Sequence, residues 1–356
     1  MLTVALTAIA TLAMSGCAMR MGPRAVTRDR FNYGATILDS WQQQMLVNMV
    51  RMRYAEPPAF LEVNQVVTSY SLDGTATVAG PGWRGETSPP LSLGGVTGHW
   101  SESPTITYNP LFGEKFTKDL LQPIPPIALL SLIQAGWPAD IVLGVGARSI
   151  NGIHAGSRTQ VMHRSGDPDF SRLLALLQQL QAADNFGVQV EQSEGGVKGT
   201  ISIQQRPGDE AINTAKRTVG ELLKLDPEAQ EYTIAFGALP KNNKEIAFTT
   251  RSMLGILAQA SGGVEVPPGD AKEGRVTATG DQPDSATEPR LMVRVRCTEH
   301  SPTATDAFVA VKYRNHWFWV DDRDIPSKRG LGFLMILFTL VESGGTAAPP
   351  VLTISK

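Results

Sequence analysis

The first seventeen residues constrain this chain most, because they determine the compartment in which the rest of it folds. Residues 4–14 are Ala, Leu, Ile, Val or Met, interrupted only by Thr, and small residues lead from them to Cys17. About a dozen uncharged residues match the apolar core of an export signal, whereas a membrane-spanning helix needs about 20. The pattern predicts export from the cytoplasm, with residues 1–16 removed as a signal peptide.

The residues around this cysteine resemble a known motif. The run LAMSGC, from Leu12 to Cys17, is similar to the lipobox of bacterial lipoproteins, although no Lys or Arg precedes it. The resemblance implies that Cys17 is acylated and that membrane lipid is its first partner. Several acyl chains anchor a protein firmly, whereas one chain alone binds marginally. In that class Ala18 is compatible with the outer membrane, so we expect anchoring there within the cell envelope, facing the periplasm or the cell surface.

Composition narrows the class of protein further. A chain of 356 residues is long enough for one large or two modest domains after loss of the signal. Its formal net charge of −2 gives no broad attraction to nucleic acid, which is not an expected partner. If Cys17 carries lipid, Cys297 has no cysteine to pair with. The alternating run 291–297 predicts that Cys297 is a buried thiol in a strand.

The order of the expected elements predicts an α+β fold, with helices packed on antiparallel sheets and a repeated helix–strand–strand unit, preceded by an N-terminal helix and a β-rich segment. The expected domains are a lipidated tether at 17–30, a helical and β-rich region at 31–165 and a C-terminal α+β domain at 166–356. Within the last of these, residues 262–290 are rich in Gly, Pro and Asp. They hold too few apolar residues to offset the entropy lost on ordering, so we expect a mobile insertion.

Hydrophobic periodicity gives the expected elements. Apolar residues three and four positions apart predict a helix over 35–53, packed in a core or forming a Met-rich binding groove. Shorter helices are expected over 116–121 and 127–133, while 139–150 fits a helix, a strand or both. The repeated unit is expected to begin with a helix through 173–180, capped by Asp169 or Ser171, followed by strands 187–191 and 199–204. A helix over 211–225, strands 232–236 and 245–250, and a helix over 252–260 are expected next. The last unit is expected as strands 291–297, 307–313 and 317–320, an apolar buried helix after Ser327, and a strand over 351–354.

The segment from Phe60 to Asn109 is poor in charge and rich in Ser, Thr and Gly. Alternation of polar and small apolar residues predicts strands over 70–78 and 105–108, joined by a long loop. Two such strands fit an ordinary antiparallel sheet with one wet face. They also fit the contribution of one subunit to an oligomeric membrane pore. The pattern leaves both interpretations open.

The sequence contains few signs of a catalytic or metal-binding site. The sequence has no His-Glu-x-x-His, Cys-x-x-Cys, phosphate-binding loop or Gly-x-Ser-x-Gly motif, and its five histidines lack the spacing of metal ligands. No cofactor or metal is expected. The best candidates are Asp321, Asp322 and Asp324, which would bind a divalent cation or supply a base beside His316. The alternative role is structural, with Asp324 or Ser327 capping the next helix and Arg323 pairing within the turn.

Three functions follow from these patterns. The first is a non-catalytic envelope lipoprotein with a structural or assembly role, which binds an envelope protein or further copies of itself. The second is an oligomeric outer-membrane pore or secretion component that uses a β-hairpin around 66–109. The third is a periplasmic hydrolase that uses the carboxylates of 316–324. The stretch from Phe308 to Lys328 resembles uncharacterised bacterial envelope proteins, and this resemblance implies no activity.

Overall fold

The structure is a computed structural model, and it describes residues 23–76, 96–111, 114–158, 163–193, 196–205, 207–277, 293–303 and 305–342. Its helices and mostly antiparallel strands confirm the predicted α+β class. The described residues fall into two compact units. The first holds residues 23–40, 60–76 and 96–111, and the second holds residues 41–59 and those from 114 onward. The expected signal peptide, Cys17 and the terminal strand over 351–354 lie outside the described residues.

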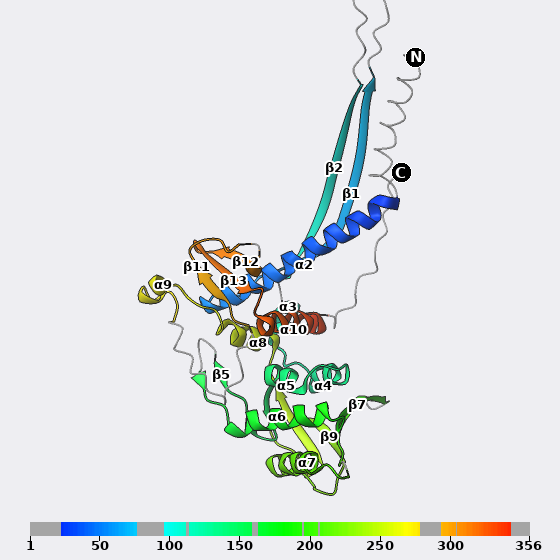
Figure 1. Cartoon of the computed structure of the whole chain (residues 1–356), viewed down its shortest axis with the longest axis vertical. Coiled ribbons are helices and arrows are strands. Elements are labelled where there is room, and N and C mark those ends of the chain that lie inside the picture. The colour runs from blue at the N-terminus through cyan, green and yellow to red at the C-terminus, as the bar shows by residue number, and fades with distance from the viewer. Residues whose placement is uncertain are drawn as a thin grey trace, which may run out of the picture. The chain divides into compact units, whose positions relative to one another are not determined.

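The first unit contains a long β-hairpin. Strand β1 (Phe60–Ala76) pairs antiparallel with β2 (Val96–Leu111), from Phe60 opposite Leu111 to Ala76 opposite Val96. The ladder has one irregularity, between Val63 and Gln65. Figure 1 shows the two strands side by side, and we call them the ribbon. The predicted strands are confirmed, and the ribbon extends well beyond the residues where alternation is clear.

Helix α2 (Pro23–Arg53) contributes residues to both units. The helix predicted over 35–53 is confirmed, but α2 begins earlier, at Pro23. Residues 23–30, expected as part of a polar tether, are therefore helical. Proline suits the first turn of a helix, and no helix-breaking residue other than Gly34 follows before residue 53.

The second unit is built on a six-stranded sheet with the order β4-β3-β10-β9-β8-β7. Its strands are β3 (Ala147–Ile150), β4 (Ile153–His154), β7 (Phe186–Ser193), β8 (Gly196–Ile203), β9 (Glu231–Phe236) and β10 (Glu245–Thr250). Helices α4 (Pro126–Gln134), α5 (Ala139–Gly146), α6 (Pro168–Ala182) and α7 (Glu210–Leu223) pack around it. The repeat is confirmed as α6-β7-β8 followed by α7-β9-β10. One pair departs from the antiparallel expectation, since β9 and β10 are parallel.

The expected boundary between residues 165 and 166 does not divide the chain. Residues 139–150 form α5 followed by β3, and β3 pairs with β10 so that Ile150 lies opposite Phe248. A small hairpin of β5 (Ser157–Arg158) and β6 (His163–Arg164) follows. The cap expected for α6 is also wrong. Asp167 occupies the N-cap position without a side-chain cap, and its Oδ2 instead accepts a hydrogen bond from the His154 N–H at 2.7 Å.

A buried arginine joins these elements. The Arg251 guanidinium donates to the carbonyl oxygens of Gly144 and Val145 at 3.2 and 3.0 Å, at the C-terminal end of α5, and to Gly156 at 2.9 Å. Burial, with a contribution from Arg148, lowers the pKa of Arg251 to about 10. The guanidinium thus satisfies carbonyl groups that a helix end leaves without intrahelical partners.

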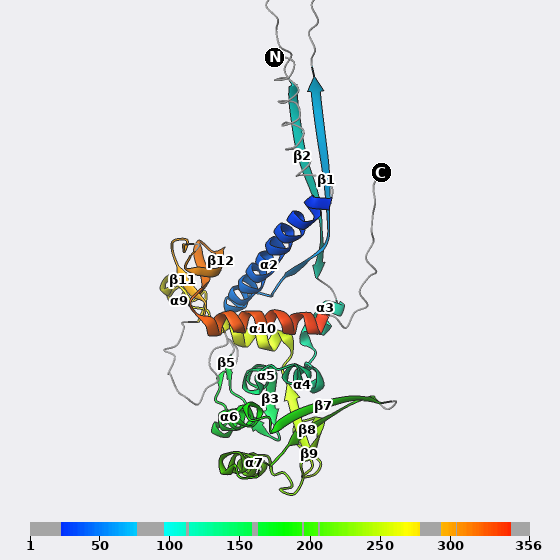
Figure 2. The same ribbon diagram turned by 45° about the vertical axis from the view of Figure 1, so that its right-hand side comes forward.

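The C-terminal part of the second unit adds a small sheet and an apolar helix. The sheet has the order β11-β13-β12 and consists of β11 (Arg296–Thr298), β12 (Ala307–Tyr313) and β13 (His316–Asp321). Helix α10 (Ile325–Glu342) lies along α8 (Met253–Ser261) and also contacts α3 (Glu114–Leu121) (Figure 2). Leu331, Phe333, Leu334 and Leu337 are fully buried, so the predicted buried helix is confirmed. Among the helices that the structure describes, none combines the length and apolar character needed to cross a bilayer.

The mobile insertion expected over 262–290 is wrong for its first part, because residues 262–277 are ordered. Residues 262–277 contain α9 (Pro268–Lys272), and Val264 forms a β-bridge with Val295. Val264 and Val276 are buried, while the Arg53 side chain donates to the carbonyl oxygens of Val264 at 3.3 Å and Thr277 at 2.9 Å. These few contacts order a segment whose composition alone predicts mobility. Residues 278–290 lie outside the described part of the chain.

Candidate functional site

The carboxylates predicted as a site lie where β13 ends and α10 begins, and each has its own partner. Asp321 is nearly buried, with its Oδ2 at 3.0 Å from Arg296 Nη2, and its Oδ1 accepts a hydrogen bond from the Arg323 N–H at 2.9 Å. Asp322 Oδ1 lies 2.6 Å from Lys328 Nζ. Neutralised by separate cations, these two carboxylates do not form a shared binding site.

Asp324 caps helix α10, as the structural interpretation predicts. Its Oδ1 accepts from the backbone N–H of Ser327 at 3.2 Å, and its Oδ2 accepts from the Ser327 hydroxyl at 2.7 Å. Arg323 does not pair within the turn as expected. It binds Asp306 instead, with Nη2 at 2.8 Å from Oδ1. The acidic run therefore forms a corner between the small sheet and α10.

His316 is not brought to these carboxylates. It begins β13, whereas Asp321 ends it, and at about 3.3 Å per residue the two positions lie roughly 17 Å apart. The His316 Nδ1 is 3.1 Å from the Arg314 carbonyl oxygen. Within the described ranges no group of three His, Cys, Asp or Glu side chains is arranged to hold a metal ion. The hydrolase hypothesis needs a convergence of His316 and the carboxylates that this geometry does not provide.

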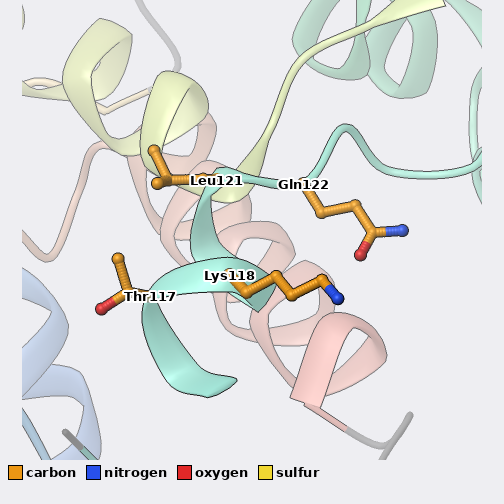
Figure 3. Close-up of a pocket in the computed structure, with 4 residues that line it drawn as sticks. All are labelled: Thr117, Lys118, Leu121 and Gln122. Carbon is orange, nitrogen blue, oxygen red and sulfur yellow. The ribbon is translucent and has the colours of Figure 1, made fainter. Parts of the chain in front are cut away.

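A surface pocket beside α3 is lined by Thr117, Lys118, Leu121 and Gln122. Figure 3 shows that Lys118 and Gln122 extend to one side, whereas Thr117 and Leu121 point to the other. Ligand sites need polar groups that converge on one volume. The pocket therefore supplies no chemistry of its own.

Aromatic and charged side chains form a cluster between the end of α2 and the turn that joins β12 to β13. The Tyr54 ring lies 5.5 Å from the Tyr313 ring and 6.4 Å from the Phe318 ring. The Arg314 guanidinium stacks 4.8 Å above the Tyr54 ring and forms an ion pair of 2.8 Å with Glu56. We call these five residues the aromatic–arginine cluster.

The cluster sits in a partly desolvated environment. Burial raises the pKa of Tyr54, and its hydroxyl donates to Asp270 Oδ2 at 2.6 Å, which favours the protonated phenol further. Hydrogen bonds from Tyr313 and Arg314 lower the pKa of Glu56. Burial also raises the pKa of the nearby Cys297 thiol to about 11. Cys297 thus stays a protonated thiol at neutral pH, which suits packing rather than nucleophilic chemistry.

The backbone at Arg314 is unusual for a residue with a side chain. Arg314 and Asn315 have φ values of 44° and 67°, as a type I′ hairpin turn requires of both central residues. A left-handed conformation costs a residue such as arginine about 1–2 kcal/mol. The stacking and the ion pair with Glu56 hold it there. Sequence reasoning missed this cluster, because Glu56 and Arg314 are separated by 258 positions and no local pattern links them.

The first unit exposes apolar side chains instead of burying them. On α2 these include Phe31, 71 % exposed, and Val26, 64 % exposed, and on the ribbon they include Leu61, Ile106 and Tyr108. Among the first-unit side chains that the structure describes, Phe60 is the only buried apolar one, while the second unit holds an extensive core. Groups of exposed apolar side chains mark surfaces that bind proteins or membranes.

No family model matches the chain, and comparison with curated proteins and with solved structures gives no match. Function must therefore be inferred from the residues of this chain.

Replacing Asp324 tests whether the acidic run is structural. We expect Asp324→Ala to lower the free energy of unfolding by about 1 kcal/mol, because the cap of α10 is lost. Asp324→Asn retains an acceptor for the Ser327 N–H and should lose less than half as much. Urea denaturation of both variants measures the difference. A loss for Asp324→Asn as large as that for Asp324→Ala would contradict the capping role.

Replacing Glu56 tests the aromatic–arginine cluster through its pH dependence. The folded state lowers the pKa of Glu56, so its contribution to stability is present above the unfolded value of about 4.3 and is lost as the pH falls through the lower folded value. Glu56→Gln should therefore have a lower free energy of unfolding than the wild type at pH 7, by about 0.5–1 kcal/mol for a partly exposed pair, and hence a lower melting temperature. This difference should disappear near pH 3.

Thermal melts of wild type and variant at the two pH values measure this gap. Glu273→Gln is the matched control, because it removes the exposed pair with Arg275 and should change neither melt. A gap between wild type and Glu56→Gln that is equally large near pH 3 would show that the ion pair is not its cause.

Proposed function

We propose that this protein is a lipid-anchored component of the bacterial cell envelope with a structural or assembly role in a membrane-associated complex. The observation that carries the proposal is the first unit, whose described apolar side chains are mostly exposed, on both α2 and the ribbon. A unit of this kind gains from a covering partner, because apolar surface left in water costs about 25 cal/mol per Å². The second unit exposes a few large apolar side chains as well, such as Phe236 and Leu239, but it also buries an extensive core of its own.

The lipobox-like run LAMSGC supports anchoring through Cys17. Val26 follows Cys17 by nine positions, so at no more than about 3.6 Å per residue it lies within roughly 32 Å of an acylated cysteine. The exposed apolar residues at the start of α2 thus lie within reach of a bilayer surface. Anchoring also concentrates copies and partners in two dimensions, which favours assembly.

Removing the lipidated sulfur tests the anchor. We expect the wild type in the membrane fraction, resisting a high-salt wash and released by detergent, and Cys17→Ser in the soluble fraction or uncleaved. Intact-mass measurement should show acyl chains on the wild type alone. Cys297→Ser is the matched control and should fractionate like the wild type. Mature-sized Cys17→Ser protein that still fractionates with the membrane like the wild type would contradict the anchor and the envelope role with it.

A second candidate function is an oligomeric outer-membrane pore or secretion component that uses the ribbon. It is favoured by the register of β1 and β2, in which several apolar residues lie opposite apolar residues and several polar residues opposite polar ones. Leu72 lies opposite Trp100 and Ala76 opposite Val96, while Ser71 lies opposite Ser101, Asp73 opposite His99 and Thr75 opposite Thr97. Residues directly opposite in an antiparallel pair share a face, so the pairs Leu72–Trp100 and Ala76–Val96 lie on one face and the three polar pairs on the other. The first face is apolar toward the tip, and Glu102, opposite Tyr70, marks where its apolar part ends.

The length of the ribbon also suits this candidate. At about 3.3 Å per residue, strands of 17 and 16 residues extend more than 50 Å. The hydrocarbon core of a bilayer is about 30 Å thick. The ribbon is thus longer than the hydrocarbon core of a bilayer is thick, so only part of its length is needed to cross that core.

Dye release from liposomes tests the pore. Wild-type protein should release a small encapsulated dye, and Leu72→Arg should reduce release about tenfold or more, because arginine on a lipid-facing position costs about 2–4 kcal/mol. Ser71→Arg, one residue away on the polar face, is the matched control and should keep most of the release. Wild type without release, or two variants with equal release, would contradict the pore.

A further inference from the structure

The outer edges of the ribbon offer backbone groups to another strand. Among the strands that the structure describes, β1 and β2 pair with each other alone. Alternate residues of an edge strand turn their N–H and C=O groups away from the paired neighbour. An isolated two-stranded hairpin is marginal in water, and a further strand is what stabilises it.

These edges carry few of the features that normally prevent pairing, and within residues 69–76 and 96–103 the only acidic residues are Asp73 and Glu102. Residues 60–76 and 96–111 contain no Lys or Arg, the residues most often used to block an edge. The irregularity at Val63 and Gln65, and the prolines Pro104 and Pro110, all lie toward the base of the ribbon. The tip half, residues 69–76 of β1 and 96–103 of β2, pairs from Ser69 opposite Ser103 to Ala76 opposite Val96 and has no proline and no bulge. Pairing is therefore open along this half.

The chemistry of an edge selects the kind of partner. Lipid supplies no hydrogen-bonding groups to backbone N–H and C=O, so a bilayer alone leaves the edges unsatisfied. Within hydrocarbon, where water is excluded, only another strand satisfies them in full. We propose that this strand belongs to a second copy of the chain, and that copies pair edge to edge along the tip half of the ribbon, with β1 of one copy beside β2 of the next.

This arrangement rests on the proposed function, because anchoring of every copy at Cys17 gives all ribbons the same direction. Two β1 edges can pair antiparallel only if one copy is reversed relative to the membrane. Pairing β1 with the β2 of the next copy is antiparallel without reversal. It also sets apolar faces side by side and polar faces side by side, and as a head-to-tail contact it can close into a ring with no free edge.

Single cysteines in full-length protein test the arrangement. With Cys297→Ser as background, we would place Ser71→Cys or Thr75→Cys on β1 and Thr97→Cys or Ser101→Cys on β2. Variants bearing two different tags are co-expressed in pairs and oxidised in native membranes. Neighbouring strands lie about 4.8 Å apart, which is within disulfide range. The expected result is disulfide-linked dimers between a β1 cysteine and a β2 cysteine, in higher yield than any pair of cysteines on the same strand.

The double variant Ser71→Cys, Ser101→Cys is the positive control. These residues lie opposite each other in one chain and should form an internal disulfide. Failure of that control would show that the ribbon is not formed and would overturn the proposal. Cross-links between β1 cysteines alone would overturn the head-to-tail order. If the internal disulfide of the control forms but no cross-link joins two copies, the second copy is not the partner. Cross-links to another protein only would overturn the proposal in the same way.

The two proposals fail in different ways. Membrane-bound wild type without cross-links between copies leaves the anchored assembly role standing and removes this inference. Cross-links between β1 and β2 cysteines, together with mature-sized Cys17→Ser protein in the membrane fraction, would retain the ribbon contact and remove the anchor. Circular dichroism and protease resistance of each cysteine variant confirm that the second unit is folded.

Discussion

A ribbon of two strands has no interior, and this constraint separates the two units of the chain. A sheet buries apolar residues only where a helix or another sheet covers a face. The six-stranded sheet of the second unit is covered in this way, and residues such as Leu173, Val219 and Ile246 are almost fully buried. The ribbon has two faces and two edges, and Ile106 and Tyr108 remain 40 % and 56 % exposed. Its stability must come from something added to it.

Helix α2 reflects the same division along its length. Met45, Leu46, Met49 and Val50 are fully buried, and each contributes about 1.5–3 kcal/mol of transfer free energy. The Met-rich stripe is therefore core packing and not a binding groove. The aromatic–arginine cluster then fixes the C-terminal end of the helix, through contacts of Tyr54 and Glu56 with Arg314. From Phe31 to Leu38, in contrast, the helix shows apolar side chains to solvent.

Local patterns predict local structure well in this chain. The α6-β7-β8 and α7-β9-β10 units follow from periodicity and glycine-rich turns, and the β12–β13 hairpin follows from aromatic alternation on either side of Arg314 and Asn315. What the patterns lack is long-range information. Nothing in 231–250 reveals that β9 and β10 run parallel, because that choice depends on the path of the intervening loop. The ordering of 262–277 depends on Arg53, more than 200 residues away.

The predicted acidic site shows the same limit. Three aspartates in four residues suggest a shared charge, but Arg296, Lys328 and Ser327 come from other positions and bind them separately. The corner at 321–324 thus holds α10 against the small sheet, with Asp321 and Asp322 each paired to its own cation and Asp324 used as the helix cap. The second unit buries an extensive core of its own, and among its described residues only Asp140 Oδ1, Thr250 Oγ1 and Trp319 Nε1 are buried side-chain atoms without a hydrogen-bond partner. Because this core is built from residues 41–59 and those from 114 onward, the second unit does not need the ribbon to bury its apolar side chains.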